Sequence, residues 1–105
     1  MPRVKLIPVQ ACLFIGLLFS GIAAAQDRRA EGLALTCYTC HSGRAVENGG
    51  IPSLEPLTRE ELIRRLTEFR AGAAEATVMD RISAAYTDEE IDIIADYITA
   101  RNKGK

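Results

Sequence analysis

The chain has 105 residues, of which 48% are hydrophobic and 26% are charged, and it carries a net charge of −1. This length accommodates one small domain, and this share of hydrophobic residues excludes an intrinsically disordered chain. The near-neutral charge, without a basic cluster, argues against a nucleic-acid partner. The chain contains three cysteines, an odd number that requires an explanation if the protein is exported.

The first 25 residues have the layout of a secretory signal peptide. Two basic residues precede an apolar run over residues 11–19, and alanines at 23–25 provide an AxA cleavage site. We therefore predict a signal peptide over residues 1–25, cleavage after Ala25 and export to the periplasm. An uncleaved anchor is the alternative, because residues 6–25 are about long enough to span a bilayer.

Cleavage would leave a domain of residues 26–105 with two cysteines, because Cys12 lies in the signal segment. That domain has 80 residues, with 11 basic and 14 acidic side chains and no tryptophan. A chain of this size buries a small fraction of its surface and often depends on a metal, a disulfide or a cofactor. We therefore expect a group other than side chains to complete the core.

Helical periodicity dominates the domain and predicts an all-α fold. Apolar residues on one face predict a first helix over residues 28–36. Residues 42–57 contain three glycines and two prolines and are predicted to form a loop.

The middle of the domain contains the clearest helix signal. Thr58 and Glu61 are spaced as a capping box, and apolar residues follow at helical spacing until Gly72, which stands where a glycine ends many helices. These signals predict a helix over residues 59–71. The next stretch, residues 73–86, is irregular and alanine-rich, with room for one short helical turn.

The C-terminal part of the chain repeats this pattern. Thr87 and Glu90 form a second capping box, and a broad apolar stripe follows them. We predict a last helix over residues 88–100, with four residues forming the stripe: Ile91, Ile94, Ala95 and Ile98.

One motif carries chemistry. Cys37, Cys40 and His41 form the pattern CxxCH, which is typical of a c-type haem attachment site. Two thiols three residues apart on a helical turn can each bond one haem vinyl group, and the following imidazole then points at the iron. The motif therefore predicts covalent haem c, with His41 as an axial ligand.

Three other interpretations of the cysteine pair compete with haem attachment. A disulfide oxidoreductase would place the pair in a βαβ context, and the pattern contains no strands. A zinc site requires four ligands, whereas residues 26–105 contain two cysteines and one histidine. A structural disulfide would leave His41 unexplained. Haem attachment accounts for all three residues.

A second axial ligand must come from a short set of donors. His41 is the only histidine in the chain, and Met79 is the only methionine after Met1. Met79 lies in the irregular stretch between two helices, which could fold across the opposite face of a haem. A single methionine is also common as core filler. By exclusion of other donors we predict His41 and Met79 as the two metal ligands, a pair that suits electron transfer.

Residues around the haem can be predicted from their chemistry. A ligating imidazole usually donates its other ring proton to a carbonyl or carboxylate, and the carbonyl of Pro52 is a candidate acceptor. Arg44 or Arg70 is a candidate partner for the haem propionates, because arginine suits carboxylates. An ordinary loop proline and solvated surface arginines are the alternatives.

The order of these features resembles a class I cytochrome c over nearly all of residues 26–105. More narrowly, the chain resembles the cytochrome subunit of flavocytochrome c sulfide dehydrogenase. The segments that carry this narrower resemblance are GIPSL at 50–54, FRAG at 69–72, TVMDRI at 77–82, YTDEEI at 86–91 and ADY at 95–97.

The resemblance implies a small fold with three main helices around one covalent haem. It implies Met79 as the distal ligand and carries the family's proline over to Pro52. It further implies a haem subunit that accepts electrons from a partner, an FAD-containing sulfide dehydrogenase, and passes them to another cytochrome or an oxidase. The alternative is a free electron carrier of the periplasm.

The sequence departs from the family where the first and last helices cross. Many members have a glycine at this crossing and an aromatic residue four positions later. Here Gly32 is followed at that distance by Thr36. We therefore expect Leu33 or Leu35 to pack against Tyr97 in its place.

Overall fold

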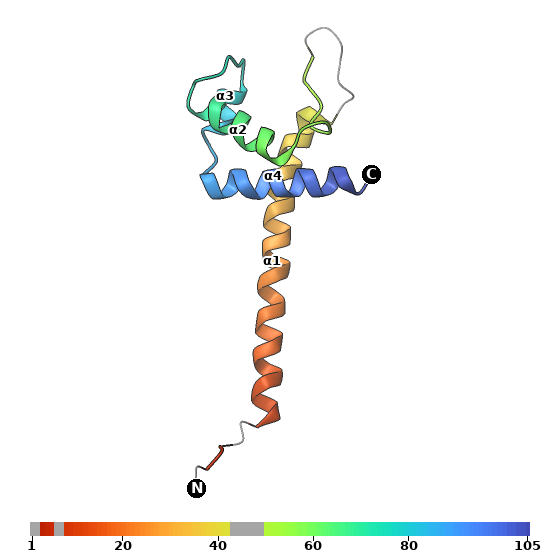
Figure 1. Cartoon of the computed structure of the whole chain (residues 1–105), viewed down its shortest axis with the longest axis vertical. Helices are drawn as coiled ribbons and strands as arrows, with labels where there is room; N and C mark the ends of the chain where they lie inside the picture. Colours follow the sequence, from red (N-terminus) through yellow and green to blue (C-terminus); the bar gives the residue numbers. More distant parts are fainter. Residues whose placement is uncertain (1–2, 6–7, 43–49) are drawn as a thin grey trace.

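The computed structural model describes residues 3–5, 8–42 and 50–105, and for residues 9–20 the helical backbone alone. Its described residues form four helices and no strand, which confirms the all-α prediction and agrees with a small class I cytochrome c fold (Figure 1). The helices are α1 (Val9–His41), α2 (Arg59–Arg70), α3 (Met79–Ser83) and α4 (Asp88–Lys103).

Both predicted capping boxes are present and explain where α2 and α4 begin. The Thr58 hydroxyl accepts from the backbone N–H of Glu61 at 3.2 Å, and the Glu61 carboxylate accepts from the N–H of Thr58 at 2.8 Å. Thr87 and Glu90 make the same pair of bonds at 3.2 and 3.0 Å. These bonds satisfy N–H groups that have no partner within the helix.

Two helix ends show how local sequence stops a helix. Helix α2 ends at Arg70, one residue before the predicted end, and Gly72 follows with a φ of 70°. That left-handed conformation favours glycine. Helix α4 runs three residues beyond the predicted Ala100, because no glycine or proline precedes Gly104 and two basic residues suit the last turn.

Helix α1 is much longer than the predicted 28–36 in both directions. No proline or helix-ending glycine interrupts the chain from Val9 to His41, so the helix continues past the short apolar face on which the prediction rested. The CxxCH motif therefore lies in the last turns of α1. The N-terminal part of α1, before Arg29, extends away from the other helices (Figure 1), and side chains 21–29 are exposed.

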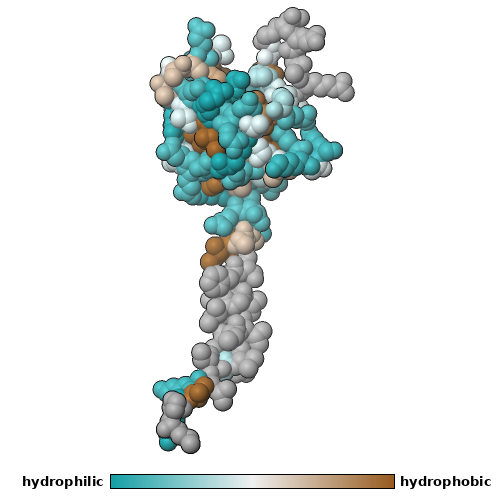
Figure 2. Space-filling view, viewed as in Figure 1, coloured by the Kyte–Doolittle hydropathy of each residue, from teal (hydrophilic) through white to brown (hydrophobic). Residues whose placement is uncertain are grey.

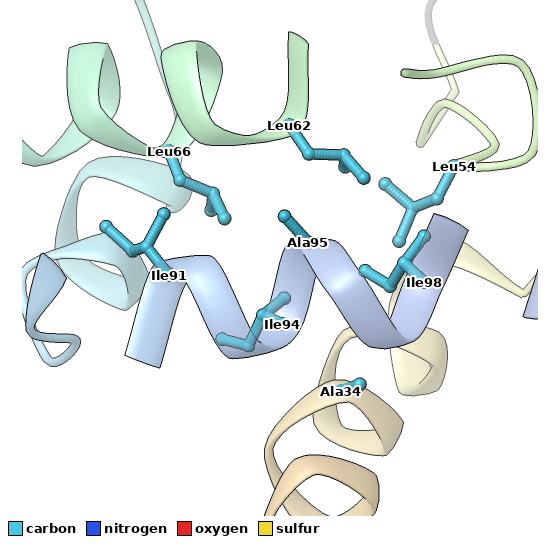
Figure 3. Close-up of a cluster of buried hydrophobic side chains, with 8 residues drawn as sticks. All are labelled: Ala34, Leu54, Leu62, Leu66, Ile91, Ile94, Ala95 and Ile98. Carbon is cyan, nitrogen blue, oxygen red and sulfur yellow. The ribbon is translucent and has the colours of Figure 1, made fainter. Parts of the chain in front are cut away.

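Helix α4 is the centre of the fold. It contacts α1 and α2, whereas α3 packs against α2. The core is a cluster of eight buried apolar residues, four of them from α4, and Figure 3 shows α4 between the side chains of α2 and Ala34 of α1. The cluster contains Ala34, Leu54, Leu62, Leu66, Ile91, Ile94, Ala95 and Ile98. The predicted stripe of α4 is thus confirmed.

The crossing of α1 and α4 is built on an alanine. Ala34 is 0% exposed, whereas a Cβ added to Gly32 would meet no atom within 4 Å. Of the two leucines predicted at the crossing, Leu33 is partly buried against the core, as is Tyr97, whereas Leu35 is 42% exposed. Helix α4 can approach α1 closely because Ala34 is small.

Other contacts fix the two crossing helices outside the core. The guanidinium of Arg101 lies 5.0 Å from the centre of the Tyr38 ring, a cation–π contact near the end of α4. At the other end of α4, Arg29 pairs with Glu89 at 3.2 Å and with Glu90 at 3.4 Å. On the face shown in Figure 2, the part that contains the packed helices is mainly hydrophilic, with small hydrophobic patches. None of the described helices has a stretch long and apolar enough to cross a membrane.

Candidate functional site

The last turns of α1 bring the three residues of the CxxCH motif together. Residues three and four apart share one side of a helix, so Cys37, Cys40 and His41 lie on neighbouring positions of its surface. The thiol of Cys37 is half-buried, and burial raises its pKa. Cys40 is exposed, and neither cysteine forms a disulfide in the structure. Both thiols are therefore available for another bond.

The ring of His41 is oriented by the loop that follows α1. Its Nδ1 lies 2.6 Å from the carbonyl oxygen of Pro52. A carbonyl oxygen only accepts hydrogen bonds, so Nδ1 carries the proton and donates. In the neutral ring this leaves the lone pair on Nε2, the form in which histidine binds a metal. The contact has the geometry expected of an oriented ligand.

A cavity of about 460 Å³ lies beside the motif. Its volume is in the range of sites for small molecules and cofactors, and most of its lining is apolar, as is typical of such sites. All four helices and the loop before α2 contribute. The main lining residues are Cys37, His41, Pro52, Leu54, Leu57, Leu62, Arg65, Leu66, Phe69, Met79, Ile94 and Ile98.

Met79 lines the same cavity as His41, although 37 residues separate the two in the chain. It is the first residue of α3 and is partly buried against the core. The short helical turn expected within residues 73–86 is thus α3. The structure brings Cys37, His41, Pro52 and Met79 to one cavity, whereas Cys40 is not among its lining residues.

The charged residues near the cavity differ from those that the sequence suggested. Arg65 on α2 lines the cavity. Arg70 already has protein partners, because it donates to the carbonyl of Tyr86 at 3.0 Å and pairs with Asp88. Arg44 lies outside the described residues. Sequence reasoning missed Arg65, although its position between Leu62 and Leu66 of the apolar face gave a signal.

The donors around the cavity suit a planar iron porphyrin better than a metal ion held by protein alone. Among residues 3–5, 8–42 and 50–105, no three His, Cys, Asp or Glu side chains gather as a metal-binding group, whereas zinc requires four ligands. One nitrogen and one sulfur donor, with an apolar lining and a half-buried thiol, fit a haem.

Two curated proteins are similar to this chain. It is 37% identical over 71 residues to the cytochrome subunit of sulfide dehydrogenase from Chlorobaculum tepidum, an alignment covering 68% of the chain and 64% of that protein. It is 34% identical over 73 residues to the thiosulfate dehydrogenase electron acceptor from Stutzerimonas stutzeri, covering 68% and 34%. The chain is related to the c-type cytochromes. No protein-family model matches it.

The relation to c-type cytochromes agrees with the site and with the helical fold. The alignments span less than two thirds of either relative, so they concern the region of similarity and leave the rest of those proteins unmatched. Both relatives bear names from the oxidation of inorganic sulfur compounds.

Proposed function

We propose that residues 26–105 form a periplasmic monohaem cytochrome c that transfers single electrons, after cleavage of a signal peptide over residues 1–25. The observation that carries this proposal is the single cavity that Cys37, His41 and Met79 all line. Cys37 and Cys40 would form the two thioether bonds, and His41 and Met79 would fill both axial positions. The bound group would supply a one-electron couple at iron.

The residues of the chain would bind and protect this group. The carbonyl oxygen of Pro52 would fix the ring of His41 and raise the basicity of the imidazole, since it accepts a hydrogen bond from Nδ1–H. The leucines and isoleucines of the cavity exclude water, which favours the less charged, reduced state. Arg65 supplies a positive charge at the cavity, suited to a propionate.

Electron transfer is favoured over catalysis at iron because two protein donors are available for the two axial positions. An enzyme that binds its substrate at iron requires an open position. We therefore propose no catalytic activity for the chain alone. It would act as the haem subunit of a sulfide-oxidising complex, with an FAD-containing sulfide dehydrogenase as electron donor and another cytochrome or an oxidase as acceptor.

The names of the relatives support the sulfur-oxidising context, since one is a subunit of a dehydrogenase and the other an electron acceptor. The second name also supports the alternative, a free carrier that shuttles electrons between redox complexes. Both functions require the same haem site and differ in the lifetime of the complex with the partner.

Covalent haem can be tested on a denaturing gel stained for haem. Protein produced with the cytochrome c maturation machinery should keep its haem through denaturation, and Cys37→Ser combined with Cys40→Ser should abolish the stain. Thr39→Ser, between the two cysteines, is the matched control and should retain it. Wild-type protein without covalent haem would refute the proposed function.

The role of Met79 requires a variant that removes the sulfur but keeps the volume. Met79→Leu should abolish the weak far-red sulfur-to-iron band of the oxidised protein, because leucine packs similarly but has no donor atom. Val78→Ala alters an exposed neighbour and should leave the band intact. A band that survives in Met79→Leu would remove Met79 from the axial position.

The partner can be identified by isolating the protein from its native periplasm at native expression. Copurification with a flavoprotein, and reduction of the haem by sulfide only when that flavoprotein is present, would support the subunit. A monomer that elutes alone and is not reduced under these conditions would favour the free carrier.

A further inference from the structure

The far end of α4 holds the loop that supplies the carbonyl of Pro52. The side-chain nitrogen Nδ2 of Asn102 lies 3.2 Å from the carbonyl oxygen of Leu54 and 3.2 Å from that of Glu55. One amide group thus binds two successive carbonyls of the loop. These carbonyls begin two residues after Pro52, whose own carbonyl accepts from His41.

The orientation of the Asn102 amide follows from its surroundings. Both groups near Nδ2 are carbonyl oxygens, which only accept, so the nitrogen must face them. The opposite orientation would set the amide oxygen against two other oxygens. The Oδ1 atom in the observed orientation is buried and has no hydrogen-bond partner among the described residues. The side chain therefore binds the loop through its two N–H donors alone.

Other contacts of the loop are weaker or lie on one side. Lys105 pairs with Glu55, but both side chains are exposed, and such pairs contribute little. The N–H of Leu57 donates to Leu54 at 3.3 Å within the loop itself. The buried side chain of Leu54 anchors the loop in the core. Asn102 adds bonds from α4 to two successive carbonyls of the loop.

We propose that Asn102 is a positioning residue that holds the Pro52 carbonyl against His41 and thereby sets the reduction potential of the haem centre. The inference rests on the proposed function. A strong hydrogen bond from Nδ1–H increases the electron donation from the imidazole to the iron. This favours the oxidised iron and lowers the reduction potential. Release of the loop lengthens this bond and should therefore raise the potential.

The sign of the change in reduction potential distinguishes a loss of the positioned Pro52 carbonyl from a general opening of the loop to water. Asn102→Leu keeps a similar volume but removes both donors, and the reduction potential of the haem-loaded protein should become more positive. Asn102→Ser keeps one donor and should give a smaller shift of the same sign. A loop that merely opened to water would instead stabilise the more charged oxidised state and lower the potential.

The matched control is Thr99→Val on the same stretch of α4. Within the part of the chain that the structure describes, the Thr99 hydroxyl bonds only carbonyls of its own helix, Ala95 at 2.8 Å and Asp96 at 3.2 Å, so its loss should leave the potential unchanged. Proton NMR adds a direct readout, since the Nδ1 proton of His41 should exchange faster with water in Asn102→Leu than in Thr99→Val.

The possible results separate this inference from the proposed function. Wild-type protein without covalent haem would refute the function. Haem-loaded Asn102 variants with an unchanged or lowered potential, or a Thr99→Val shift of equal size, would refute the positioning role and leave the function standing. If Asn102→Leu does not load haem, the shift of the reduction potential in Asn102→Ser tests the positioning role in its place.

Discussion

Ala34 is the small residue over which α4 crosses α1, and enlarging it should destabilise the protein. Its side chain is 0% exposed in the core cluster, and Figure 3 shows it close to α4. Ala34→Leu forces a larger side chain into this contact, and overpacking of this kind costs about 1–3 kcal/mol. For a domain of this length each kcal/mol lowers the melting temperature by about 4–8 °C. We therefore expect a loss of at least about 4 °C.

At Gly32, in the same helix, we expect a larger side chain to stabilise the protein, in contrast to Ala34. It is exposed, and a Cβ added there meets no atom within 4 Å. Glycine inside a helix costs about 1 kcal/mol relative to alanine, so Gly32→Ala should stabilise the protein by up to that amount. The measurement is urea unfolding of both haem-loaded variants beside the wild type. If Gly32→Ala destabilises the protein as much as Ala34→Leu does, then the helices cross at Gly32 and the reasoning is wrong.

Three further predictions concern the ends of the helices. Thr87→Ala removes the hydroxyl that caps α4 and should lower the free energy of unfolding by about 1 kcal/mol, measured by urea denaturation. The backbone N–H of Thr87 holds the pKa of Glu90 below its usual value, and Thr58 does the same for Glu61. The stability that both carboxylates contribute should be fully present above about pH 4.3 and should be lost as the pH falls through their lowered pKa values. The double variant Glu61→Gln with Glu90→Gln should lose less stability over this pH range. Identical acid unfolding curves for the variant and the wild type would contradict this prediction. Arg29→Ala breaks exposed ion pairs and should cost at most about 1 kcal/mol, a difference that disappears in high salt.

The sequence was sufficient for features that neighbouring residues determine. The capping boxes at Thr58 and Thr87 depend on residues three positions apart, and the stop at Gly72 depends on one conformation. The stripe of α4 follows from helical spacing. The CxxCH motif is equally local, because its three residues occupy one end of one helix.

Features that depend on packing between distant segments could not be predicted from the sequence alone. The burial of Ala34 rather than Leu35 depends on where α4 crosses, and spacing in α1 does not determine that position. The position of Arg65 between two leucines is visible in the sequence, but only the folded chain shows that this face of α2 lines the cavity. The bond between Asn102 and Leu54 joins residues 48 apart, and α4 continues past its predicted end in order to make it.

The central position of α4 has a consequence for the order in which the protein matures. Helix α4 supplies half of the buried core and follows the other described helices in the chain, so α1 has no helix to pack on until α4 has been synthesised. The CxxCH motif, in contrast, follows closely behind the predicted signal peptide. Under the proposed function, both thiols would reach the periplasm on an unfolded chain, accessible to the haem attachment machinery, and α4 would then enclose the attached group.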